Sequence, residues 1–169
     1  MRAFLLYARS RQVPASVAAA AVCCLLVRLL PDDPRSPALA ITAAVSALAV
    51  GLTGQDPDLD RTASWPWPAY RLAHVAAIAV VTAVLVAGMA PLEFVVRGCV
   101  GMSGLAALAA ALFGSQLAWT LPCTWFAVSI FTGSWLFAPP DSVEAVCVAA
   151  AFGAVGAATH VLIQSTLKL

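Results

Sequence analysis

Charged side chains are scarce in this sequence, and none lies in the middle of its long apolar runs. Only 10% of the 169 residues are charged and 62% are hydrophobic, whereas about a quarter are charged in an ordinary soluble domain. We therefore expect the chain to lie in a bilayer. The net charge of +1 gives no basic field, which argues against a nucleic-acid partner. Transport coupled to an ion gradient generally uses ionisable groups at the membrane midplane, so it is also disfavoured.

Motifs for catalysis, metal binding and nucleotide binding are missing as well. The cysteines form no C-x-x-C pair and read as small buried hydrophobes: Cys23, Cys24, Cys99, Cys123 and Cys147. Lys168 is the one lysine, and no G-x-x-x-x-G-K-[ST] motif precedes it, so the chain has no P-loop. No serine, cysteine or aspartate stands in a recognisable nucleophile motif. We predict no catalytic residue, no metal site, no bound cofactor and no enzyme activity of this chain's own.

Six apolar runs predict an all-α, polytopic membrane protein with a single domain over 1–169. Each run is near the length that crosses hydrocarbon as a helix, and the runs cover about 13–30, 36–53, 72–90, 95–114, 118–137 and 143–163. Prolines and charges mark most of the breaks between them. No charge separates the fourth and fifth runs. That division could be displaced by several residues, or the fifth run could contain a re-entrant turn at Pro122.

The N-terminal segment over 1–12 has apolar residues at helical spacing, with Arg2 and Arg9 on another face. This pattern indicates a short amphipathic helix at the membrane interface; the alternative is a basic tail that only sets topology. The apolar run that follows ends in VRLLPDD rather than in a small-residue cleavage site, so we expect the segment to be retained.

Small residues recur at helix-packing intervals in two of the runs. They are Gly98, Gly101 and Gly104 in one run and Ala149, Gly153 and Ala157 in another. Small faces let helix backbones approach closely in lipid. The pattern predicts close packing either within one subunit or between two subunits.

The distribution of basic residues predicts the orientation of the chain. Six of them fall on one side of the six-span arrangement and three on the other: Arg2, Arg9, Arg11, Arg61, Arg71 and Lys168 against Arg28, Arg35 and Arg97. Both termini and the 54–74 loop are therefore expected in the cytoplasm. Arg28 and Arg97 lie near the outer ends of their spans and are expected to snorkel. The chain has no asparagine and a large excess of arginine over lysine, which suggests a GC-rich bacterial genome. We therefore expect the chain in the cytoplasmic membrane of a bacterium.

The longest polar segment, GQDPDLDRTASWPWPAYRLAH from Gly54, has three alternating aspartates: Asp56, Asp58 and Asp60. They resemble the start of a calcium loop, but Arg61 replaces its glycine and Trp67 its final glutamate. The D-x-x-D-G-x-x-A-R pattern of head-group transferases is absent too. Helix capping is a simpler role for the aspartates, with a short helix over 59–64.

Aromatic residues follow the aspartates in the same segment. Trp65, Trp67 and Tyr70 are expected at head-group depth, with Arg71 beside them as a further interface anchor. Pro66 and Pro68 are expected to keep the backbone extended until the third span begins near Arg71. A capped interfacial turn that only joins two spans would account for these residue types. It leaves unexplained why the connection has about twenty residues where two to eight usually suffice.

The layout resembles the membrane subunits of type 2 ABC exporters, in a compact form like those of actinobacteria. Those permeases have an amphipathic N-terminal helix, six spans, and a cytoplasmic coupling helix between spans two and three. The corresponding text here is DPDLDRTASWPWPAYRLAH, within a loop over 54–71. The chain departs from the family in its short length, its minimal external loops and its lack of a glutamate-glycine pair in the coupling segment.

The resemblance implies a permease that exports an amphiphilic substrate such as a drug or peptide antibiotic. ATP and magnesium would be bound by a separate ATP-binding subunit, and a second permease copy, identical or different, would complete the pore. The residues expected at the ATPase surface are Asp56, Asp58, Asp60 and Arg61. Two other classes remain open: a membrane assembly or immunity protein that binds another membrane protein, and a small lipid-modifying membrane enzyme.

Overall fold

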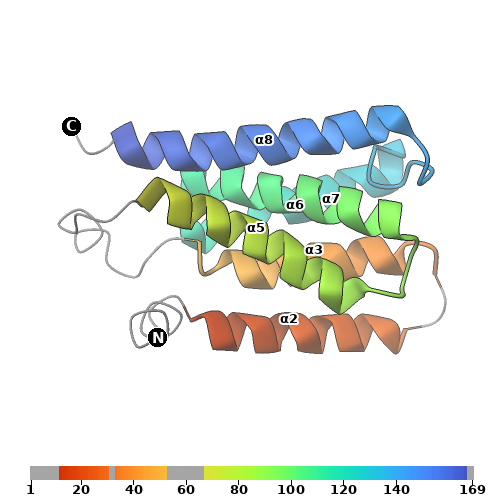
Figure 1. The fold of residues 1–169 in the computed structure, drawn as a ribbon. Coiled ribbons are helices and arrows are strands. Elements are labelled where there is room, and N and C mark those ends of the chain that lie inside the picture. The colour runs from red at the N-terminus through yellow and green to blue at the C-terminus, as the bar shows by residue number, and fades with distance from the viewer. Residues whose placement is uncertain (1–11, 31–32, 53–66, 167–169) are drawn as a thin grey trace.

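The computed structural model of this chain describes residues 12–30, 33–52 and 67–166, and these residues are helical throughout apart from short connections (Figure 1). The helices are α2 (Val13–Arg28), α3 (Ser36–Ala49), α5 (Trp67–Val86), α6 (Leu92–Phe113), α7 (Thr120–Thr132) and α8 (Val143–Thr166), with a 3-10 turn, η1 (Ser115–Leu117). The all-α prediction is confirmed for the described residues.

Successive helices run in opposite directions along a common axis (Figure 1). One end of the bundle carries the start of α2, the end of α3, the start of α5 and the end of α8; we call it the α3–α5 end. The opposite end carries the end of α2, the start of α3, the end of α7 and the start of α8; we call it the α2–α3 end. The alternation agrees with the order of runs predicted from the sequence.

Helix length differs from the expectation of six runs that each span hydrocarbon. Among the described residues, three helices are long and apolar enough to cross a membrane: α5 over Ala69–Val86, α6 over Leu92–Phe113 and α8 over Val143–Ile163. The other three, α2, α3 and α7, have 16, 14 and 13 residues. The apolar sequence continues beyond the ends of these shorter helices, but the backbone there forms turns instead of helix. After α3, for example, the amides of Gly51 and Leu52 bond only three residues back, to Leu48 and Ala49.

Several helix ends lie some residues from the approximate bounds predicted for the runs, and backbone conformation accounts for two of these differences. The fifth run was expected to be helical to residue 137, but α7 ends at Thr132 because Gly133 is left-handed with φ 62°. The third span was expected near Arg71, but α5 begins at Trp67 with Pro68 in its first turn, where a missing amide donor costs little. Pro122 likewise lies in the first turn of α7.

The core is built around α6 and α3. Helix α6 packs against α3, α5, α7 and α8, and α3 packs against α2, α5, α6 and α7. Fully buried side chains at their contact include Ile41, Val45 and Met102. Of the three long helices, α6 is mostly enclosed, whereas α8 exposes large apolar side chains such as Val155 and Leu162.

The closest helix contact joins α6 to α8 through glycines. A Cβ atom at Gly104 would lie only 2.5 Å from the Cα of Gly153, and one at Gly156 would lie 2.8 Å from the Cα of Gly104. Real Cβ atoms do not approach backbone so closely, so these positions require glycine. The small residues Gly104 and Gly153 thus pack within the subunit, as one of the two predicted alternatives has it. Gly98 and Gly101 make other contacts, with Ile41 and Trp135.

Candidate functional site at the α3–α5 connection

The residues predicted to meet an ATPase all lie outside the described part of the chain. Asp56, Asp58, Asp60, Arg61 and Trp65 all fall in 53–66, and the predicted interfacial helix over 1–12 falls almost wholly in 1–11. Trp67 is the first residue of α5. The site is therefore built from the two helices that flank this connection.

Both flanks of the connection are anchored in the core. Leu48 and Leu52 are buried where α3 ends, and Val75 and Ile78 are buried in the first half of α5. The two helices pack against each other, and each also packs against α6. A displacement of the connection would consequently move α3 and α5, which both pack on α6, the most enclosed of the three long helices.

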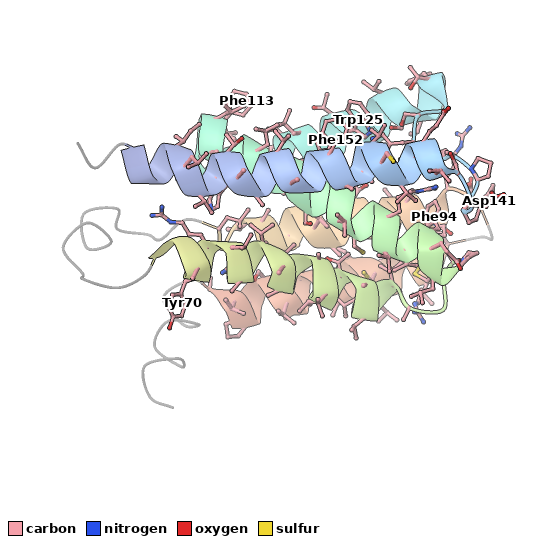
Figure 2. All side chains as sticks on the ribbon, turned by 45° about the horizontal axis from the view of Figure 1, so that its top comes forward. Tyr70, Phe94, Phe113, Trp125, Asp141 and Phe152 are labelled. Carbon is pink, nitrogen blue, oxygen red and sulfur yellow. The ribbon has the colours of Figure 1, made fainter. Side chains whose placement is uncertain are left out.

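The first turns of α5 present one exposed and one buried polar side chain. Tyr70 is 39% exposed and points away from the bundle (Figure 2), whereas Arg71 is only 8% exposed. An exposed tyrosine at the end of an apolar helix has the amphipathic character of an interface anchor. Arg71 instead lies inside the bundle. His160 of α8 is fully buried, which fits the structural role that histidines at span boundaries usually have.

Arginines at the α2–α3 end bind backbone carbonyls. Arg97 donates from Nη1 to the carbonyl oxygen of Pro139 at 2.8 Å and from Nη2 to that of Ala138 at 2.6 Å. Its guanidinium also lies 5.6 Å from the centre of the Phe94 ring. Arg97 is 4% exposed, so the expectation that it snorkels is wrong: the α7–α8 connection folds over it and supplies acceptors.

Arg28 makes a similar link between two other helices. Its Nη2 donates to the carbonyl oxygen of Ala87 at 2.7 Å and lies 3.4 Å from that of Leu85, at the end of α5. Carbonyls in the last turn of a helix lack intrahelical donors, and a cation there also complements the helix dipole. Arg28 therefore fastens the end of α2 to the end of α5. The sequence predicted that Arg28 and Arg97 lie on the same side of the bundle, as the structure has them, but it did not reveal their hydrogen bonds to backbone carbonyls.

An amphiphile route would need aromatic side chains that line a common path, whereas those of α6, α7 and α8 are partly packed and partly exposed. Trp125 stacks on Trp135 with ring centres 6.4 Å apart and meets Phe152 edge-on at 5.1 Å. Figure 2 shows Trp125 beside Phe152, and Phe113 pointing outward from the end of α6. Phe113 is 54% exposed and Phe131 is 88% exposed. These rings form packing contacts and outer surface, and no continuous route between them is defined.

Titratable side chains in the described ranges do not gather into a metal centre. No group of three His, Cys, Asp or Glu residues there could hold a metal ion. The cysteines are free thiols. Their predicted role as small buried hydrophobes is confirmed for Cys24 and Cys99, whereas Cys147 is exposed.

Comparison with known proteins gives no relative from which a function can be transferred. No family model, no curated protein and no solved structure matches this chain.

Proposed function

We propose that this chain is the membrane-spanning permease subunit of an ABC exporter, with six membrane helices and with its ATP-binding subunit on a separate chain. The observation that carries the proposal is the anchoring of the α3–α5 connection. The longest polar segment of the sequence joins two helices that pack on each other and on α6. This arrangement supports a coupling role for the segment.

The mechanism follows from those contacts. Closure of the ATPase partner on ATP and magnesium would push on 56–70, where Asp58, Asp60 and Arg61 would meet its surface. The push would pass to α3 and α5 and from them to α6, because all three helices are in mutual contact. Transport would then use a change in helix packing between two discrete arrangements. The permease itself would carry out no chemistry.

A second copy of the permease would complete the pathway. Helix α8 packs chiefly on α6 and exposes apolar side chains over much of its length, including Val146, Val155 and Leu162. A partner permease or lipid would cover that face. In the orientation predicted from the basic residues, both termini and the α3–α5 end lie in the cytoplasm of a bacterium, and the α2–α3 end lies outside.

Co-purification tests the proposal. We expect the tagged full chain, extracted in mild detergent, to retain an ATP-binding protein that is identified by its peptides and whose ATPase rate changes with the permease present. Replacing Asp56, Asp58, Asp60 and Arg61 together by serine should reduce recovery of the ATP-binding protein at least tenfold, because the contact between it and this chain would be lost.

A matched control places neutral residues at the opposite end of the bundle. The double variant Asp141→Ser, Glu144→Ser removes acidic charge from the α7–α8 connection and the first turn of α8 and should leave recovery unchanged. Absence of any ATP-binding protein from the intact chain, with the chain monodisperse in detergent, contradicts the proposal. An equal loss in both variants would show that the serine substitutions act through folding.

A further inference from the structure

A pocket of about 480 Å³ lies at the α2–α3 end of the bundle. Three separate parts of the chain form it: the start of α3 with Arg35, the first turn of α6 with Phe94, and the segment from the end of α7 to Pro140. Its volume lies within the range of about 300–1,000 Å³ typical of small-molecule sites. The pocket is distant from the α3–α5 connection and is not used in the proposed coupling role.

The lining combines apolar walls with one charged side chain. Phe94, Ile130 and Phe137 supply apolar surface, and among the residues that the structure describes only Arg35 adds a charge to the lining. Arg35 is exposed and forms no ion pair with the residues that the structure describes. The nearest described carboxylate, that of Asp33, accepts a hydrogen bond from the backbone amide of Arg35 at 2.7 Å.

Backbone and helix geometry add to the positive character of this site. Arg35 is also the N-cap residue of α3, and the N-terminus of a helix carries partial positive charge. The carbonyls of Ala138 and Pro139, two lining residues, are already engaged by the buried guanidinium of Arg97. In the wall that they form, both carbonyl oxygens therefore already accept hydrogen bonds, and the positively charged guanidinium of Arg97 lies behind them.

Apolar side chains beside the pocket are fully open to the surroundings. Phe131 on α7 is 88% exposed and Leu92 at the start of α6 is 72% exposed. Leu92 lies at the start of α6, a helix long and apolar enough to cross a membrane, and an exposed apolar side chain at such a helix end meets lipid where the acyl chains give way to head groups. We propose that the pocket binds the anionic head group of a membrane phospholipid, with Arg35 contacting the phosphate and Phe94, Ile130 and Phe137 contacting the adjoining apolar part.

Native mass spectrometry of the full chain with defined lipids tests the proposal. The probes are phosphatidylglycerol and phosphatidylcholine with identical acyl chains. We expect at least tenfold higher occupancy by phosphatidylglycerol, because only its head group carries net negative charge. Arg35→Gln should reduce that preference to less than twofold. An undiminished preference in the Arg35→Gln variant overturns the proposal.

A second pair of variants tests the pocket rather than the charge. Ile130→Trp places a larger side chain in the pocket wall and should lower phosphatidylglycerol occupancy at least fivefold. Val155→Trp changes an exposed apolar residue of α8 that does not line the pocket and should have no effect. Equal occupancy in the two variants contradicts the site. Full competition by millimolar glycerol phosphate would identify a site for a soluble anion and would likewise overturn the lipid assignment.

Discussion

At the scale of single residues, two arginines hold together parts of the chain that are distant in sequence. Arg97 joins α6 to the α7–α8 connection, and Arg28 joins α2 to the end of α5. Both bind carbonyl oxygens, which are dipoles without formal charge, so neither link depends on a titratable acid. When these two structural cations are set aside, only Arg35 remains as a basic residue on the predicted outer side. The excess of basic residues on the predicted cytoplasmic side over the outer side is then larger, and it favours the same orientation.

Replacing Arg97 should destabilise the bundle. Arg97→Gln leaves both carbonyls, those of Ala138 and Pro139, without a charged donor, and a hydrogen bond to a charged group contributes about 1.5–3 kcal/mol. We expect a lower midpoint of thermal unfolding in detergent, measured by the loss of monodisperse protein. Arg35→Gln is the control, because the exposed Arg35 side chain should have little effect on the same midpoint in lipid-free detergent.

An unchanged midpoint for Arg97→Gln would mean that the two hydrogen bonds contribute no net stability. Arg97→Lys should lie between wild type and Arg97→Gln. Lysine keeps the charge but lacks the planar fork that reaches two carbonyls at once.

At the scale of helices, the α6–α8 contact constrains the sequence most strongly. At Gly104 and Gly156 the backbones approach so closely that any side chain would strike main-chain atoms, which cannot move aside, whereas a Cβ at Gly153 would first meet the Cγ1 atom of Val100 at 2.8 Å. Gly98 of the same helix differs, because its added Cβ would meet the terminal Cδ1 of Ile41 at 2.8 Å. A side-chain terminus can rotate away.

These two glycines give a matched pair of substitutions. Gly104→Ala should separate α6 from α8 and cost at least about 1–3 kcal/mol, the usual range for overpacking. Gly98→Ala should be much milder, because Ile41 can adjust and alanine favours the helix by about 1 kcal/mol. Thermal unfolding of both variants in detergent measures the difference. Equal midpoints would contradict the close backbone approach.

The sequence predicts the helices well where polar residues bound them and poorly where apolar residues turn. The starts of α2 at Val13 and α8 at Val143 agree with the predicted runs. After α7, however, Trp135 and Leu136 are buried without being helical. The α7–α8 connection packs against the core and therefore has the apolar composition of a buried helix. Only the left-handed Gly133 marks where α7 ends and the connection begins.

The sites were less accessible to sequence reasoning than the helices. The partners of Arg97 lie 41 and 42 residues away, and no periodicity relates positions across such a distance. The pocket at the α2–α3 end likewise combines three breaks of the chain. Its one sequence signal is that the proline-rich stretches PDDPRSP and APPDS fall on the same side of the six-span arrangement.

At the scale of the whole molecule, the alternating helices set which connections share a side. The start of α2 and the end of α8 lie at one end of the bundle, and the α7–α8 connection lies at the other (Figure 1). In the proposed orientation, a green fluorescent protein fused after Leu169 should fluoresce and an alkaline phosphatase fused there should be inactive. Truncation after Asp141 with the same reporters should reverse both signals. Matching signals at the two positions would contradict the topology.

The short length of α7 also has a consequence for the surrounding bilayer. Thirteen residues extend about 20 Å at 1.5 Å per residue, whereas the hydrocarbon layer is about 30 Å thick. The 24 residues of α8 are long enough to cross it completely. The molecule thus presents a hydrophobic mismatch to lipid along one flank and none along the other. A membrane helix shorter than the hydrocarbon layer is accommodated by local thinning of the bilayer, so in the proposed six-helix arrangement we expect shorter acyl chains to gather beside α7.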